Sequence, residues 1–195
     1  TFTGVVQLAG DVTVDSDVTG TDIDGNISFS STVTGRKDLV ILSGSGDVTI
    51  TGNIGTGGTP LTSLDINQSA GTGNITLSGN IGAAGASGSG ITRIGNDNMN
   101  GTLTFGGIDY NTTGAQTYIA DAYSMTGTDP DFATDDDNIG FEDGSINLAT
   151  VADLTVDTGS GTAGNISIEG AIAGTSDSST TTVLLEAGSG SVAVA

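Results

Sequence analysis

Carboxylates are the side chains in this 195-residue sequence best suited to chemistry. Oxygen ligands of this kind, on flexible loops, suit the variable coordination of calcium. Two groups therefore predict calcium as the one candidate cofactor, against the alternative of solvated acidic loops. The stronger group is Asp129, Asp131, Asp135, Asp136, Asp137, Glu142 and Asp143. The weaker is Asp15, Asp17, Asp22 and Asp24, which resembles an EF-hand loop only in part because its glycine is misplaced and no closing Glu follows.

Catalytic chemistry has few candidates. The chain has no His and no Cys, which excludes Ser-His-Asp and Cys-His nucleophiles and transition-metal sites built from nitrogen or sulfur ligands. Paired carboxylates can hydrolyse glycosides, and the pairs to consider are Asp47 with Asp65 and Asp22 with Asp24. In a chain with 23 acidic residues, solvated surface carboxylates are the favoured interpretation. We therefore expect no catalytic residues and a protein that is not an enzyme.

The charge balance excludes some partners. Three basic residues against 23 acidic ones give a formal net charge of −20, so no basic patch is available for nucleic acid or for an anionic membrane surface. The longest apolar runs are a few residues, so we expect no membrane insertion.

A short motif recurs along the chain and indicates how these side chains are positioned. It reads Gly-[Asp/Asn/Ser/Thr]-h-x-h, with h an apolar residue, and begins at Gly10, Gly25, Gly46, Gly73, Gly101, Gly144, Gly164 and Gly190. Such recurrence is the signature of a repeat architecture. A further apolar residue, expected to be buried beyond a corner, follows in seven of the eight copies: Val18, Val33, Ile54, Ile81, Ile108, Val151 and Ile172.

The alternation within the motif places its two apolar residues on one face of a strand. We expect these residues to point inward in two stacked columns: Val12, Val14, Ile27, Phe29, Val48, Ile50, Ile75, Leu77, Leu103, Phe105, Ile146, Leu148, Ile166 and Ile168. The residue between them points outward. Thr13, Thr49, Thr76 and Thr104 occupy that position, where an ice-binding rank is one interpretation and a β-branched ladder on a pleated surface is the favoured one.

These features predict one all-β domain over residues 1–195. The expected fold is a continuous parallel β-helix (β-solenoid) of about eight coils with essentially no helix. Second strands are expected to precede several motifs, at Leu39, Leu64, Leu154 and Val183, and the turns absorb the uneven motif spacing. An irregular acidic insertion around 111–143 would hold one extra coil and a protruding loop. The alternative fold is an antiparallel β-sandwich.

Three segments carry a resemblance to known proteins. LVILSGSGDVTITGNIG, LDINQSAGTGNITLSGNIG and LTVDTGSGTAGNISIEGAIAG are similar to repeats of filamentous-haemagglutinin-like and autotransporter-passenger-like bacterial surface proteins, as is NTTGAQTY from Asn111. The resemblance implies a right-handed parallel β-helix, export to the cell surface or extracellular matrix, and adhesive or structural work. It supplies no catalytic residues.

Two functional hypotheses follow. The first is a non-enzymatic structural or adhesive segment of an exported bacterial protein that stacks end to end into a fibre, because both ends are strand-like and carry no cap. Its expected partners are copies of itself or flanking repeats, and a host-surface or matrix glycan. The second is a carbohydrate-binding or carbohydrate-acting β-helix, although three Tyr, five Phe and no Trp leave little for stacking on sugars.

Overall fold

The protein is a parallel β-solenoid. The computed structural model describes residues 1–17, 24–55, 58–68, 71–82, 92–97, 99–148, 153–161, 164–174 and 181–195. Over these residues the secondary structure is strand, turn and bend without helix, and every strand pair is parallel. No helix in this part of the chain is long and apolar enough to cross a membrane. The predicted parallel β-helix is confirmed, and the alternative of an antiparallel sandwich is wrong.

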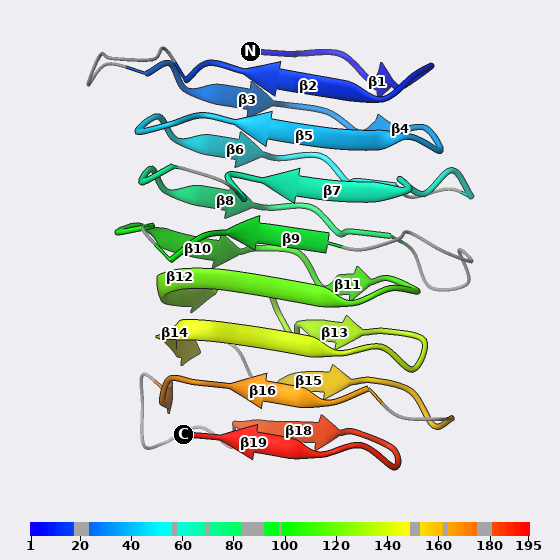
Figure 1. The fold of residues 1–195 in the computed structure, drawn as a ribbon, viewed down its shortest axis with the longest axis vertical. Helices are drawn as coiled ribbons and strands as arrows, with labels where there is room; N and C mark the ends of the chain where they lie inside the picture. The colour runs from blue at the N-terminus through cyan, green and yellow to red at the C-terminus, as the bar shows by residue number, and fades with distance from the viewer. Residues whose placement is uncertain are drawn as a thin grey trace.

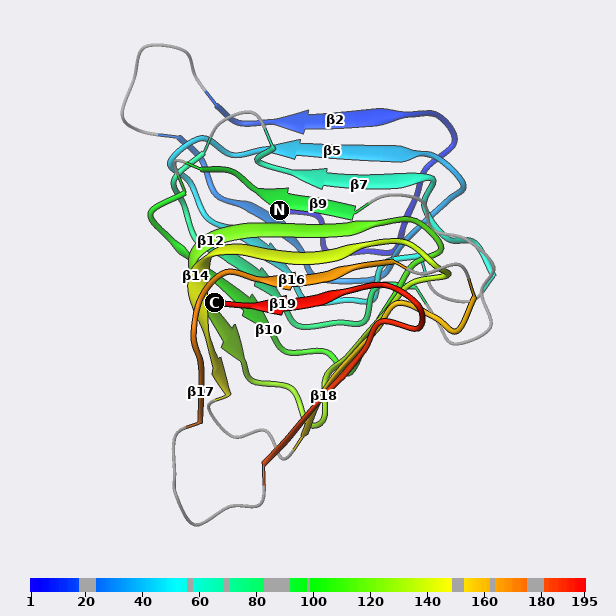
Figure 2. The ribbon, with the colours of Figure 1, turned by 60° about the horizontal axis from the view of Figure 1, so that its bottom comes forward.

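The strands form three sides, which we call A, B and C (Figures 1 and 2). Side A contains β2 (Val12–Asp15), β5 (Asp38–Leu42), β7 (Ser63–Ile66), β9 (Thr92–Gly95), the first half of β12 (Gln116–Met125), the first half of β14 (Ile139–Leu148), β16 (Ile166–Ile168) and β19 (Val192–Val194). Side B contains β3 (Ile27–Phe29), β6 (Val48–Ile50), β8 (Ile75–Leu77), β10 (Thr102–Phe105), the second halves of β12 and β14, and β17 (Ile172–Gly174). Side C contains β1 (Val6–Gln7), β4 (Val33–Thr34), β11 (Asp109–Asn111), β13 (Asp131–Ala133), β15 (Asp153–Asp157) and β18 (Thr182–Glu186).

The chain winds through these sides in the order A, B, C. In Figure 1 the strands of side A run leftward in front and those of side B run rightward behind while the chain descends, which makes the winding right-handed. The eight strands of side A are joined by seven successive parallel pairs, so seven turns separate β2 from β19. This is close to the eight coils predicted.

The recurring motif occupies two different sides. The copies that begin at Gly10, Gly164 and Gly190 lead into β2, β16 and β19 on side A, whereas the other five lead into strands of side B. The uneven spacing of the motif therefore has a second cause besides turn insertions. The spacing is shortest between Gly10 and Gly25, where the motif recurs on the next side of the same coil, and longest between Gly101 and Gly144, where β12 provides a coil without the motif.

This placement corrects the predicted core. Twelve of the fourteen residues expected inside are buried, and Val12 and Val14 in the first coil are partly buried. They do not form two columns, because those on side A and those on side B face the axis from different directions. Side C adds its own column, which runs from Val6 through Val33, Ile54 and Ile81 to Tyr110 and beyond. Ile108, expected to be buried on this side, is exposed, and Tyr110 takes its place opposite Ile81.

Residues 111–143 lie in the three ladders. The extra coil expected in this segment is β12, which pairs with β9, β10 and β14, and the acidic stretch that follows contains β13 in register with β11 and β15. The inner side of these coils is aromatic. Phe105, Tyr110, Tyr118, Phe132 and Phe141 pack with ring centroids 4.7–6.4 Å apart, and Tyr123 contacts Phe141. Aromatic rings fill this part of the axis in place of the aliphatic residues used elsewhere.

The structure explains why the motif begins with glycine followed by Asp or Asn at the corner before side B. A Cβ on Gly73 would lie 2.1 Å from the carbonyl oxygen of Gly46, so only glycine fits there. The Asp or Asn that follows accepts a hydrogen bond from the next coil: Asn26 Oδ1 accepts from the Asp47 amide, Asp47 Oδ1 from the Asn74 amide and Asn74 Oδ1 from the Thr102 amide, each at 2.9 Å. The motif is thus a stacking element as well as a turn.

Candidate functional site

Acidic side chains form two neighbouring columns on the outer surface of side C. Asp109 lies opposite Asp131 in the β11–β13 pair, and Asp157 lies opposite Glu186 in the β15–β18 pair. These residues alternate along each strand with buried ones such as Phe132, so their side chains point outward. Like charges directly opposite each other on adjacent strands destabilise a sheet, which makes this surface a candidate functional site.

Asp131 shows how the neighbouring charges in these columns affect a carboxyl group. Partial burial raises the pKa of the Asp131 carboxyl, and the nearby charges of Asp109 and Asp157 raise it further. The Oδ1 atoms of Asp131 and Asn111 are buried and accept no hydrogen bond among the described residues. The surface is therefore more stable when a proton or cation offsets its charge.

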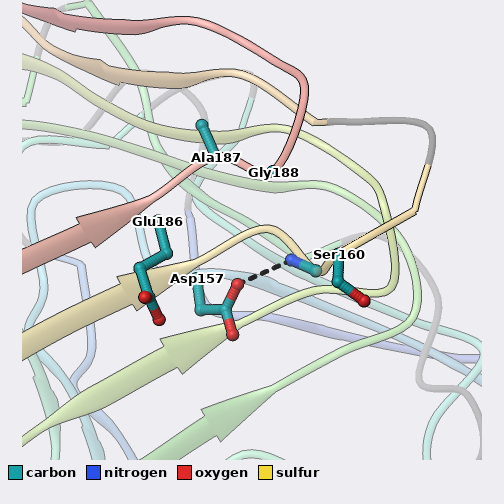
Figure 3. A pocket seen from close by; sticks show the side chains of 6 residues that line it. Asp157, Ser160, Glu186, Ala187 and Gly188 are labelled. Atoms are coloured by element: carbon teal, nitrogen blue, oxygen red, sulfur yellow. Dashed lines mark hydrogen bonds between the residues drawn. The ribbon is translucent and has the colours of Figure 1, made fainter.

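A groove of about 540 Å³ lies beside these columns near the C-terminal coil (Figure 3). It is lined by Asp157, Gly159, Ser160, Glu186, Ala187 and Gly188. One carboxylate oxygen of Asp157 accepts a hydrogen bond from the Gly159 amide at 2.8 Å. The Asp157 and Glu186 carboxylates could accept hydrogen bonds from hydroxyl groups or approach a cation.

The seven residues of the stronger calcium prediction are spread around one coil. Asp129 precedes β13 and accepts from the Asp153 amide at 3.2 Å, Asp131 lies on side C, and Asp136 at the next corner accepts from the Gly161 amide at 2.7 Å. Glu142 and Asp143 lie beyond that corner in β14, on side A and at its corner with side B. The described residues hold no group of three acids arranged to bind a metal. Calcium binding stays a prediction.

The weaker group is partly assembled at one corner. A Cβ built on Gly44 would lie 2.2 Å from the Asp24 carboxylate and 3.2 Å from that of Asp17, so both side chains reach this glycine. The Asp24 carboxylate accepts hydrogen bonds from the Ser45 amide at 2.7 Å and the Ser45 hydroxyl at 3.0 Å. Asp15 accepts from the Asp17 amide at 2.9 Å, and Asp22 lies outside the described residues.

The candidate glycosidase pair of Asp47 and Asp65 is not brought together as a pair. Asp47 lies at the corner before side B, where its Oδ1 accepts a hydrogen bond from the Asn74 amide. Asp65 lies on side A opposite Arg93; its pKa is raised by partial burial, lowered by Arg93 and raised by Asp38. The other candidate pair includes Asp22, which is not described. Partial burial and the neighbouring Glu169 also raise the pKa of Glu142.

Outward hydroxyl groups do align on one side. Thr49, Thr76 and Thr104 are in register on side B and are continued by Ser124, whereas Thr13 lies on side A. The predicted threonine rank is thus real over three coils and does not include Thr13. Its partly buried, β-branched members fit the ladder interpretation.

Sequence reasoning missed the opposition of Asp157 and Glu186. The sequence did contain a signal, because LTVD from Leu154 and VLLE from Val183 align residue for residue. The sequence alone did not show that these two segments lie on the same side of the solenoid. Aromatic residues offer the groove nothing for stacking on sugars. Seven of the eight in the chain are buried, and the eighth, Phe2, lies in the first coil.

Comparison of the chain with family models, with curated proteins and with solved structures finds no match. The architecture itself is compatible with β-helix repeat proteins.

Proposed function

We propose that this protein is a non-enzymatic structural or adhesive segment of an exported bacterial surface or extracellular protein. The observation that carries the proposal is the continuous parallel ladder, in which each coil is held by backbone hydrogen bonds to the next around one apolar core. A solenoid of this kind suits a spacer, because each coil contacts only its neighbours and the stack extends in one dimension.

Two further features support this function. The repeat segments resemble those of filamentous-haemagglutinin-like and autotransporter-passenger-like proteins, which implies surface display. The buried tyrosine hydroxyls are used in structural hydrogen bonds: that of Tyr118 donates to Gln116, that of Tyr123 to the Tyr118 carbonyl and that of Tyr110 to the Leu77 carbonyl.

Localisation in the cells that make the protein tests the proposal. An antibody raised against the folded chain should label intact cells or the surrounding matrix, and external protease should remove the signal without lysis. Labelling that requires permeabilised cells would contradict surface display. A cytoplasmic protein assayed in the same samples provides the control for leakage.

The groove between Asp157 and Glu186 favours a second candidate, a carbohydrate-binding β-helix in which carboxylates accept hydrogen bonds from sugar hydroxyls. A glycan array probed with the wild type, with the Asp157→Asn/Glu186→Gln variant and with Asp121→Asn as an exposed acidic control tests it. Binding lost only in the double variant supports the groove as a glycan site. Equal signals from all three chains, or none, exclude it.

A further inference from the structure

Asn100 is the one asparagine in this chain that is followed by glycine. It lies with Gly101 at the corner that leads from β9 on side A into β10 on side B. The Asn100 side chain is exposed, and it makes no hydrogen bond within the part of the chain that the structure describes. The Gly101 amide likewise donates to no acceptor among those residues. The side-chain carbonyl and the backbone amide that follows it are therefore both unengaged.

We propose that Asn100 is a site of spontaneous covalent modification, deamidation through a cyclic imide. The Gly101 nitrogen attacks the side-chain carbonyl carbon of Asn100 and gives up its proton. The C–N bond of the side-chain amide breaks, and ammonia leaves with that proton. Water then opens the imide at either carbonyl. Opening at the backbone carbonyl gives isoaspartate, and opening at the side-chain carbonyl gives aspartate, so the net reaction consumes water, releases ammonia and needs no oxidant or cofactor.

Glycine in the second position removes the steric obstacle to ring closure. The nitrogen reaches the preceding side chain only in backbone conformations that a Cβ on its own residue restricts. Isoleucine, whose branched Cβ crowds its own amide nitrogen, follows six of the other asparagines. These six are Asn26, Asn53, Asn74, Asn80, Asn138 and Asn165. Asn100 therefore has the least hindered neighbour of the corner asparagines.

Hydrogen bonds between coils hold other corner asparagines away from this reaction. Asn53 Oδ1 accepts from the Asn80 amide at 3.0 Å, and the Ile54 amide, which would have to attack, donates to the Asn80 carbonyl at 2.8 Å. Asn138 is held in the same way, because its Oδ1 accepts from the Asn165 amide at 2.7 Å. An amide that must first leave an ordinary hydrogen bond reacts about fivefold to tenfold more slowly.

Burial protects two further asparagines. Asn67 is fully buried, and its Oδ1 accepts from the Ser43 amide at 2.8 Å. Asn96 is 6 % exposed, and its side-chain amide donates to the Asn67 carbonyl at 2.7 Å. Asn100 thus combines three properties that these residues lack: an exposed side chain, an unengaged amide after it, and a glycine that carries this amide.

The position of the corner decides what isoaspartate does to the fold. Isoaspartate adds one methylene to the backbone directly before Gly101, where even a Cβ would lie only 2.9 Å from the Gly73 carbonyl oxygen. The next residue, Thr102, donates its amide to Asn74 Oδ1 at 2.9 Å and begins β10, which pairs with β8 and β12. A longer backbone displaces this contact in the middle of side B. Aspartate keeps the shape of asparagine and leaves the contact in place.

Ageing of the folded 195-residue chain at mildly alkaline pH and body temperature tests the site. Peptide mapping by mass spectrometry locates the change of amide to carboxyl, and an isoaspartyl methyltransferase with a labelled methyl donor measures isoaspartate. Asn100 should be the first asparagine modified, and its rate should lie within a few-fold of that in the same chain unfolded in urea. First modification at another asparagine would overturn the proposal. So would a folded-state rate at Asn100 more than about tenfold below the unfolded rate, because the corner would then hold one of the reacting groups.

Asn100→Gln is the matched control. It keeps an exposed side-chain amide before Gly101 but has to close a larger ring, so the isoaspartate label should fall to background. The melting temperature of the aged wild type should fall below that of the fresh protein, while aged Asn100→Gln and fresh Asn100→Asp should keep theirs. Equal labelling of the wild type and Asn100→Gln would place the modification elsewhere. An unchanged melting temperature in isoaspartate-rich wild type would refute the displacement at β10. None of these outcomes depends on the surface-labelling result.

Discussion

At the scale of single residues, the direction of a side chain decides what a substitution costs. Ile75 is fully buried between Val48 and Leu103, whereas its neighbour Thr76 points outward. Ile75→Asp would bury a carboxylate without a partner and should destabilise the protein by at least about 3 kcal/mol. Thr76→Asp should cost less than about 1 kcal/mol. Urea unfolding of the two variants measures the difference in stability. Equal losses of unfolding free energy would mean that Ile75 does not point inward and that the register of β8 is different.

Asp131 is the residue at which removal of a charge should stabilise the fold. Its carboxylate is partly buried opposite Asp109, so Asp131→Asn should raise the free energy of unfolding at pH 7 by a few tenths to about 1 kcal/mol. Asp135→Asn, at an exposed position in the same segment, is the control and should have a smaller effect.

The pH dependence of that gain follows from the sign of the pKa shift. The folded-state pKa of Asp131 is raised, so the folded protein binds this proton more tightly than the unfolded chain does. Stability from this group is therefore full below the ordinary Asp pKa of about 3.9 and is lost as the pH rises through the folded pKa. Thermal melts at pH 7 and near pH 4 should show the gain of Asp131→Asn shrinking in acid. A gain that is the same at both pH values would contradict this cause.

At the scale of elements, the corners before side B tolerate fewer amino-acid types than the strands do. Gly73→Ala would place a Cβ 2.1 Å from the Gly46 carbonyl oxygen and force the coils apart, which should cost about 1–3 kcal/mol. Gly25→Ala is the matched control, since its Cβ would find only Ser16 at 3.8 Å. Chemical denaturation should separate the two variants. Similar stabilities would show that the corner relaxes without loss.

At the scale of the whole molecule, the net charge of −20 makes stability sensitive to cations. If the acidic segment 129–143 binds a divalent ion, calcium should be preferred to magnesium and should raise the melting temperature beyond an equal ionic strength of NaCl. Replacing Asp135, Asp136 and Asp137 with Asn should abolish that excess. Identical melting curves in calcium and in matched NaCl would leave only general screening of the acidic surface.

The sequence by itself determined the class of fold. Alternating apolar residues behind a glycine specify a short strand with one buried face, and their repetition without any helical stripe leads to stacked coils. The motif also identified the core, because Ile27, Ile75 and Ile166 are buried wherever their strands lie. These inferences depend only on neighbouring residues, so the sequence was sufficient for them.

The side to which each strand belongs was decided only by the tertiary structure. The same motif forms β2 on side A and β8 on side B, because a strand with one apolar face fits any side. For the same reason the acidic residues predicted as one site are distributed around a coil, while Asp157 and Glu186 meet across strands β15 and β18. Paired strands of successive coils join residues twenty or more positions apart, and a local sequence pattern does not specify which distant residues pair.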